Sequence, residues 1–561
     1  MNPLAVCRTP WGASTTIMLI MVGVAGLVVG CGSPPPPPVT QPTEQVRVMP
    51  VVSEDVREKL LEGAVSVLDR LEDYDEEAAF AQVFDRLNQW SHAAVIAGHT
   101  PTANWQADPL FEGVPERLRA GVTPLSLGSA VFDAEKDMIA LRDQRWLADI
   151  AATARGDAVD DLEIAANLFR WTVRSLALVS DPPMAATEAA PGSRWFLPGE
   201  ILLSGRASPA QRAWIFLELL RHAGLEGVML ATGDADRGGV RAWIPAVIAD
   251  GEAWLFEPTY GIPIAGPDGT GVATARQAAT DPTILGRLSF ADRSYPVQAA
   301  DIAGLSVLVA ADPWSLSRRM RAVDDQLVGS RSMNLAIDAS AVGTRALQAL
   351  PSATGDEAVA SRRVGLWEFP WEVLARRQSD PARLRAAVGK ELTVMSVGLS
   401  QSGRGNGPES RRSARMVRPL YAARLREFRG ELNGPEGAKA SYLAARPGRQ
   451  AIAEAVASAP PEQADGLKRL FEQMKEDATY WLGVLTLEEG ENATAVDYLG
   501  RMTLEAAPDS RWTDAARVNL ARALVGLGRT EEAVALLRED ASPQRFGSRL
   551  LAEELEKSAK P

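Results

Sequence analysis

The chain has 561 residues, enough for several domains, and its apolar content is that of an ordinary globular protein. The formal net charge of −13 argues against nucleic acid as the main partner, because phosphate backbones attract basic proteins. Only two cysteines and three histidines are present (Cys7, Cys31, His92, His99 and His222). We therefore expect no disulfide framework, no Cys/His metal cluster and no cofactor.

The first 30 residues predict a targeting segment. An apolar run at 17–29, short for a membrane-spanning helix, ends in Gly30 and Cys31, and five prolines follow within residues 31–49. This pattern resembles a bacterial lipoprotein signal followed by a semi-rigid tether. The resemblance implies a lipid (palmitate) on Cys31 and a membrane protein facing the periplasm or the exterior, and Gly32 is compatible with outer-membrane sorting. An uncleaved anchor and a plain secretory signal remain as alternatives.

Residues 50–145 are expected to be helical. Acidic residues after Ser53 open a helix to about Leu71, and a second helix is predicted at 76–94. Residues 98–127 carry repeated Pro and Gly and are expected to be mostly loop. Farther on, the pattern predicts helices at 146–154 and 160–176, followed by a Pro/Ala-rich loop at 181–193.

A helix and a β-hairpin follow. Ser208 and Gln211 have the spacing of a capping box, Pro209 suits the first helical position, and Gly224 suits the end of the helix. His222, near that end, is interpreted as a satisfied, partly buried side chain. Two strands at 240–249 and 252–256 flank an Asp-Gly pair, which strongly indicates a hairpin.

These stretches resemble the core of the transglutaminase-like, papain-related superfamily. That family carries Gly-x-Gly-x-Cys, Leu-Leu-Arg-x-x-Gly, His-Ala-Trp and Trp-x-x-Asp-Pro-Thr. This chain has GRASP at 205–209, LLRHAG at 219–224, RAW at 241–243 and WLFEPT at 254–259. The resemblance implies a domain over 146–296. The family's Cys, His and Asp fall at Pro209, Arg241 and Glu257.

These replacements predict a protein without the family's catalysis. Proline offers no nucleophile, and arginine stays protonated and cannot act as a base at neutral pH. A two-residue turn would put Arg241 and Glu257 on opposite sheet faces, but a bulge near Pro245 would let them form an ion pair. Ser208, Trp243 and Trp254 are candidate cleft residues, although capping is the simpler role for Ser208 and hairpin packing for the two tryptophans.

Residues 297–378 are expected to form a small α/β unit. Strands are predicted at 305–310, 333–337 and 364–369, with intervening helices capped by Asp312 and Asp338. The glycine-rich stretch 266–271 is interpreted as turns, since the strand–loop–helix context of a phosphate loop is missing.

Residues 379–476 are expected to be helical, with a polar loop at 401–413. Residues 477–561 resemble tetratricopeptide repeats. Leu482-Gly483, Ala495 and Leu499 mark one unit, and Leu520-Ala521, Ala533 and Leu537 the next, with Gly490 and Gly528 near the turns. A degenerate unit is expected at 422–445. An ordinary helical bundle is the alternative, whereas repeats imply a protein or peptide partner.

Taken together, the sequence predicts an α+β protein with a transglutaminase-like core, a small α/β unit and a helical, repeat-like C-terminal region. The leading hypothesis is a membrane-anchored, non-catalytic binding or scaffold module of the bacterial cell envelope. One alternative is an envelope peptide hydrolase with a non-standard site near Ser208. A second alternative is a mainly structural envelope component.

Overall fold

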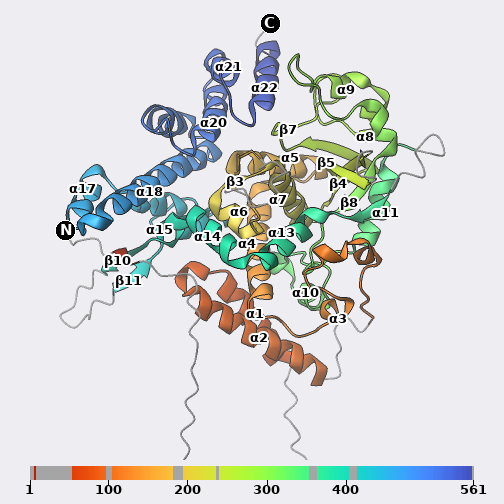
Figure 1. Cartoon of the computed structure of the whole chain (residues 1–561), viewed down its shortest axis with the longest axis horizontal. Coiled ribbons are helices and arrows are strands. Elements are labelled where there is room, and N and C mark those ends of the chain that lie inside the picture. Colours follow the sequence, from red (N-terminus) through yellow and green to blue (C-terminus); the bar gives the residue numbers. More distant parts are fainter. Residues whose placement is uncertain are drawn as a thin grey trace, which may run out of the picture.

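The computed structural model describes residues 6–7, 54–96, 104–180, 194–234, 239–352, 363–402 and 414–558 (Figure 1). Within these ranges the fold is α+β, with many helices around one six-stranded sheet. The predicted lipid site at Cys31, the 31–49 tether and the loop at 181–193 lie outside the described residues, as do nearly all of the signal segment and most of the 401–413 loop.

The six-stranded sheet has the order β7-β6-β5-β4-β8-β9, and all neighbours are antiparallel except β8 and β9. Its strands are β4 (Glu226–Asp234), β5 (Gly239–Ala249), β6 (Glu252–Glu257), β7 (Ile262–Pro263), β8 (Ser306–Val309) and β9 (Val364–Leu366). The predicted hairpin is confirmed: Ala249 lies opposite Glu252, and the two turn residues, Asp250 and Gly251, have φ of +53° and +72°. Positive φ at both positions is what a type I′ turn requires.

Strand β4 was not predicted, although its apolar run at 228–231 carries a strand signal. Its position explains why the expected small α/β unit at 297–378 is not separate. Strand β8 pairs with β4, and β9 extends the same sheet. Without β8, the edge of β4 would present a row of unpaired backbone groups. The prediction of an independent sheet there is therefore wrong.

Local details of this unit also differ from expectation. Residues 333–337 form no strand, and the third strand stops at Leu366. Asp312 caps a turn by accepting the N–H of Ser315 (2.8 Å), and α10 (Arg318–Asp324) begins only after a second cap, Ser317. The predicted cap at Asp338 is confirmed at the start of α11 (Ala339–Ala349).

The N-terminal helices are α1 (Glu54–Leu68), α2 (Glu76–Ile96), α3 (Pro124–Leu127), α4 (Lys136–Ala154) and α5 (Asp161–Ser175). The predicted helices are confirmed by α1, α2 and α5. Helix α3, however, lies within the stretch 98–127 that was expected to be mostly loop, and α4 begins at Lys136 and not at 146. The boundary expected between residues 145 and 146 falls inside α4, whose buried residues run from Asp137 to Ala151. A continuous helix packed along its length therefore joins the N-terminal region to the rest of the fold. Short 3-10 helices cover Leu71–Asp73, Pro109–Gly113, Glu116–Leu118, Ala299–Gly304, Gly329–Arg331 and Thr393–Ser396.

Helix α7 (Pro209–His222) lies at the centre of the molecule (Figure 1). Every residue from Gln211 to Leu220 is buried, because α4, α5 and β4 all pack against it. Its end is also as predicted: Gly224 has φ +79°, and the N–H of Leu225 returns to the carbonyl of Leu220 (2.9 Å). Before it, α6 (Pro198–Ser204) leads into β3 (Arg206–Ala207), which pairs in parallel with β2 (Ala177–Leu178).

Past the hairpin, the glycine-rich stretch forms turns as predicted, with the N–H of Gly269 bonded to the carbonyl of Gly266 (2.9 Å). Two short helices follow, α8 (Ala275–Thr280) and α9 (Pro282–Gly286). Thr274 and Gln277 form a capping box at the start of α8.

The rest of the chain is almost entirely helical. Its helices are α13 (Glu368–Ser379), α14 (Pro381–Glu391), α15 (Pro419–Phe428), α16 (Ala438–Ala445), α17 (Arg449–Ala457), α18 (Pro461–Glu488), α19 (Asn492–Val496), a π-helix (Asp497–Glu505), α20 (Thr513–Gly526), α21 (Thr530–Arg538) and α22 (Arg545–Ser558). An unpredicted hairpin of β10 (Gly398–Ser402) and β11 (Ala414–Val417) interrupts them, with β1 (Val6–Cys7) at its edge.

Helical hairpins occur at both stretches expected to be repeats. Gly490 and Gly528 take positive φ (+74° and +72°) in the turns after α18 and α20. Gly483 lies so close to Leu499 that an added Cβ would be 2.7 Å from its side chain. The boundary expected at residue 477 falls inside α18. The region 477–561 is therefore joined to the region 379–476 by a continuous helix.

One hydrophobic core runs from Leu61 in α1 to Ala552 in α22 and includes α7. It covers the sheet face that carries Met229 and Val247, while a second core covers the face that carries Val228 and Ala246. This alternation is the period of two expected of a sheet buried on both sides. In the described part of the chain, no helix is both long and apolar enough to cross a membrane.

Candidate functional site

The start of α7 is the position that the family resemblance assigns to the nucleophile. Ser208 is 4 % exposed and forms the predicted capping box. Its Oγ accepts the N–H of Gln211 (3.3 Å), and its own N–H donates to Gln211 Oε1 (3.0 Å). Pro209 occupies the first helical turn. Both side chains therefore serve the helix start.

No described histidine can act as a base for Ser208. His222 is the last residue of α7, about 21 Å away at about 1.5 Å per residue. Its Nε2 bonds Gln144 Oε1 (2.7 Å), and burial, followed by the charge of Arg221, lowers the pKa of His222 well below its usual value. His222 was interpreted as a satisfied side chain, and this holds for Nε2 only, because Nδ1 is buried without a hydrogen-bond partner among the described residues. His92 lies in α2, and His99 is outside the described residues.

The predicted ion pair between Arg241 and Glu257 does not form. A bulge is present beside Pro245: Met229 lies opposite Pro245 but Ala231 lies opposite Ala242, so β5 carries an extra residue. Arg241 is nevertheless exposed near the start of β5, whereas Glu257, at the end of β6, is 4 % exposed. Pairing them would require burying the guanidinium, which is costly without further partners.

Glu257 instead binds a tyrosine that the sequence did not single out. It accepts the O–H of Tyr295 and the N–H of Thr259 (2.8 Å), and Tyr295 in turn accepts the Nε1–H of Trp243 (3.0 Å). Burial raises the pKa of Glu257, although these donors oppose the rise, and burial raises the pKa of Tyr295 well above its usual value. A residue 38 positions away in the chain has no fixed-spacing signal by which to find it.

The remaining candidate cleft residue, Trp254, is partly buried, and its Nε1 donates to the carbonyl of Ala249 (3.2 Å), which braces the hairpin turn. Trp243 belongs to the Tyr295 chain, and Ser208 belongs to the helix cap. The structure therefore assigns a structural contact to each of the three.

The first turn of α7 is covered by the C-terminal region. Buried Arg212 donates to the carbonyl of Leu176 (2.6 and 2.9 Å), to that of Pro258 (3.1 Å) and to Gln544 Oε1 (2.7 Å). Burial, followed by the nearby charge of Arg522, lowers the pKa of Arg212 to about 9. The space left beside it measures about 10 Å³, at the lower limit for one water molecule. No room for a substrate remains there.

A second contact closes the same region. A Cβ added to Gly205 would lie 2.1 Å from the ring of Trp481, and Trp512 is also in contact. Nearby, Glu391 binds three arginines: Arg194 (3.2 Å), Arg206 (3.1 Å) and Arg511 (3.6 Å). Burial alone would raise the pKa of Glu391, but these three charges outweigh it and lower the pKa.

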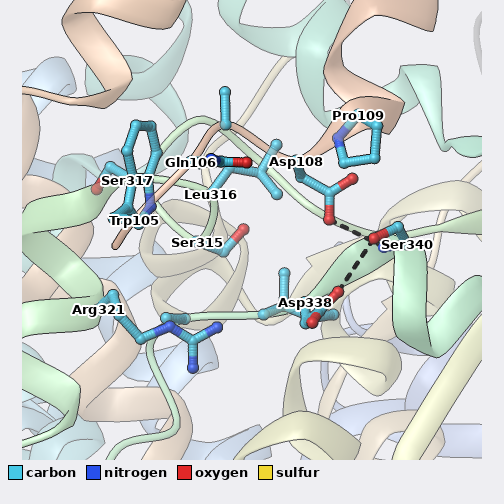
Figure 2. Close-up of a pocket in the computed structure, with 13 residues that line it drawn as sticks. Trp105, Gln106, Asp108, Pro109, Ser315, Leu316, Ser317, Arg321, Asp338 and Ser340 are labelled. Atoms are coloured by element: carbon cyan, nitrogen blue, oxygen red, sulfur yellow. Dashed lines mark hydrogen bonds between the residues drawn. The ribbon is translucent and has the colours of Figure 1, made fainter. Parts of the chain in front are cut away.

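A larger opening lies elsewhere in the molecule. A cavity of about 230 Å³ is formed between residues 105–109 and the segment from α10 to α11 (Figure 2). It is lined by Trp105, Gln106, Ala107, Asp108, Pro109, Ser315, Leu316, Ser317, Arg321, Ala336, Ile337, Asp338 and Ser340. Sequence reasoning singles out one of these, Asp338, and only as a cap.

Two aspartates hold the walls of this cavity together. Asp108 accepts the N–H of Leu110 through Oδ1 and the N–H of Ser340 through Oδ2, both at 2.9 Å. Asp338 Oδ1 accepts the N–H of Ala341 (3.0 Å) and the Oγ–H of Ser340 (3.1 Å). The N-terminal segment is thereby attached to the start of α11.

Comparison of the chain with protein-family models, with curated proteins and with solved structures finds no match. Across the described ranges, no group of three or more His, Cys, Asp or Glu side chains is arranged to hold a metal ion.

Proposed function

We propose that this protein is a membrane-anchored, non-catalytic binding or scaffold protein of the bacterial cell envelope. In this proposal a degenerate transglutaminase-like core carries tetratricopeptide-like repeats, and a lipid on Cys31 holds the chain at the membrane. The observation that supports it most is the helix start at Ser208. Its hydroxyl accepts a backbone N–H, no described base is in reach, and C-terminal side chains fill the space around the first turn of α7.

The repeat-like helices carry part of this proposal, but one face of them is already occupied. Asn519 in α20 donates to the carbonyl of Arg174 in α5 (3.1 Å), and Arg174 also pairs with Glu488 in α18 (2.7 Å). A protein partner would therefore use the outward side, where Val525 and Leu527 are 37 % and 40 % exposed. Apolar side chains exposed at such a place are suited to an interface.

The partner hypothesis is tested by crosslinking and co-purification from native membranes with the lipidated chain. Truncation after Lys475 would cut α18 and remove buried Trp481, so surface substitutions are the sharper tool. We expect a defined protein partner with the native chain and its loss in the double variant Val525→Asp/Leu527→Asp. The matched control is Val328→Asp, which alters an exposed valine outside the repeat-like region 477–561. Equal recovery of that partner with the double variant would contradict a repeat-mediated scaffold.

Membrane attachment has its own test. Metabolic labelling with a palmitate analogue should tag the native chain and leave Cys31→Ala untagged, and the variant should move from the membrane to the soluble fraction. Labelling of the variant at an equal level would rule out Cys31 as the lipid site.

The alternative, a peptide hydrolase near Ser208, requires a reactive hydroxyl. A fluorophosphonate probe that modifies activated serines should leave the folded protein unlabelled. Labelling that is present in the native chain and absent in Ser208→Ala would favour the hydrolase instead.

A further inference from the structure

Arg321 is an arginine of α10 that points into the 230 Å³ cavity (Figure 2). Its side chain is partly buried and has no hydrogen-bond or ion-pair partner among the described residues. The neighbouring Arg319, by contrast, makes a two-bond contact with Asp137 (2.6 and 2.7 Å). A free guanidinium presents five N–H donors in a rigid fork that matches the two oxygens of a carboxylate.

Asp338 lines the opposite side of the same cavity (Figure 2). Its Oδ1 is used in the cap of α11, whereas Oδ2 has no hydrogen-bond partner within the described ranges. Arg321 and Asp338 therefore carry opposite charges in one cavity without pairing to each other. In the other acid of the cavity, Asp108, both oxygens already receive a backbone N–H group, so Asp338 Oδ2 is the carboxylate oxygen left without a hydrogen bond from the described residues.

The remaining walls limit the size and shape of an occupant. Trp105, Leu316 and Ile337 supply apolar surface, and Ser315 adds a polar side chain to the wall (Figure 2). The volume of about 230 Å³ restricts the cavity to a small molecule. An occupant of amino-acid to dipeptide size fits this space, with two charged ends and a small apolar middle.

We propose that this cavity binds a small zwitterion, an amino acid or a short peptide with free ends. The carboxylate of the ligand accepts two hydrogen bonds from Arg321, its ammonium group donates to Asp338 Oδ2, and its side chains pack on Trp105. Charge-assisted pairs of this kind are the strongest hydrogen bonds available to a ligand. The site uses no residue of α7 or of the C-terminal helices, so it does not depend on the scaffold proposal.

Calorimetric titration of the full chain with alanine, dialanine and two blocked dipeptides tests the proposal. N-acetyl-dialanine keeps only the carboxylate, and dialanine amide keeps only the ammonium group. We expect dialanine or alanine to bind, and each blocked form to bind at least tenfold more weakly. Arg321→Gln should abolish the advantage of dialanine over its amide, and Asp338→Asn its advantage over the acetylated form.

The variants are chosen so that folding does not decide the result. Arg321 makes no hydrogen bond or ion pair with a described residue that glutamine would break, and asparagine retains the helix cap at position 338. Arg501→Gln, which alters an exposed arginine of the π-helix, is the matched control and should bind like the native chain. The proposal is overturned if neither alanine nor dialanine binds at millimolar concentration, if N-acetyl-dialanine binds as tightly as dialanine, or if Arg321→Gln leaves binding unchanged.

Discussion

Arg212 and Glu257 both lie near the start of α7. The charged group of each side chain forms hydrogen bonds that hold neighbouring segments of the fold together. Arg212 gives its N–H groups to three carbonyl oxygens, those of Val173, Leu176 and Pro258, and to one amide oxygen, and it has no carboxylate partner among the described residues. Glu257 accepts from Tyr295 and from a backbone N–H. Buried charges are tolerated when hydrogen bonds satisfy them, and these contacts fix the positions of the surrounding elements.

Replacing Arg212 with lysine should show how much the hydrogen bonds of its guanidinium contribute to the free energy of unfolding. Lysine keeps the charge but cannot reproduce the fork, so at least one buried carbonyl loses its donor. We expect the free energy of unfolding in urea to fall by about 2–4 kcal/mol. Arg501→Lys, on the surface, should change it by less than about 0.5 kcal/mol. Equal effects of the two variants would show that the Arg212 contacts contribute little.

We expect Asp149 in α4 to make the stability of the folded protein depend on pH. Burial raises its pKa from 3.8 to about 6 against the lowering by Arg145, and the Asp69 carboxylate adds to the rise. Because the folded pKa lies above the unfolded one, this contribution to stability is full below about pH 3.8 and is lost as the pH rises through 6.

The corresponding experiment compares the native chain with Asp149→Asn in urea unfolding from pH 4 to pH 7. The native free energy of unfolding should fall relative to the variant by up to about 3 kcal/mol over that range. A constant difference between the two proteins would place the folded pKa of Asp149 near its ordinary value.

Among the helices and strands, α7 is the clearest case in which the sequence signals for a helix and the observed packing agree. The capping box, the proline at the first position and the glycine beyond the end all occur where the sequence predicts them. The same agreement holds for the hairpin turn and for the cap of α11. In each case the signal involves residues within about four positions of one another, so tertiary contacts are not needed to specify it.

Removing the helix cap at Ser208 should lower the free energy of unfolding only slightly, and we expect Ser208 to have no catalytic role. Ser208→Ala loses the acceptor for the N–H of Gln211, and we expect the free energy of unfolding to fall by about 1 kcal/mol. Ser208→Thr retains a hydroxyl acceptor and serves as the control. A loss above about 3 kcal/mol in Ser208→Ala alone would mean that Ser208 holds more than the helix start.

On the scale of the whole molecule, one hydrophobic core joins the N-terminal helices, α7 and the C-terminal helices. Tyr480 and Trp512 stack at 4.3 Å within it, and Trp481 packs edge-on against both. The C-terminal helices are therefore part of the body that buries α7. We expect the described part of the chain to unfold as a unit.

The variant Gly205→Ala tests directly whether α7 and the C-terminal helices share one core. The added Cβ would lie 2.1 Å from Trp481 at a residue with φ +62°, so both the contact and the backbone oppose it. We expect a loss of more than about 2 kcal/mol, in line with overpacking, and faster hydrogen exchange in α18 and α20 as well as in α7. Gly466→Ala, in open space on α18, should be neutral or stabilising. Faster exchange confined to α7 would contradict a shared core.

Much of the local structure, then, was predictable from the sequence, and the candidate site was not. Each N-terminal helix, the α7 cap and the hairpin carry short-range patterns. The partners of Glu257, the closure around Arg212 and the cavity at Arg321 are set by residues tens to hundreds of positions apart. No periodicity records such separations, and one sequence without relatives offers no other signal.

The sequence by itself determined the α+β fold class, the central helix and hairpin, and the Pro, Arg and Glu at positions 209, 241 and 257, where the resemblance would place Cys, His and Asp. Tertiary structure alone decided that β8 and β9 join the main sheet, that the expected boundaries at 146 and 477 fall inside helices, and that C-terminal side chains fill the space beside α7. The physical reason is that strand edges and apolar helix faces are satisfied by whichever surface can bury them, and local sequence does not say which surface that will be.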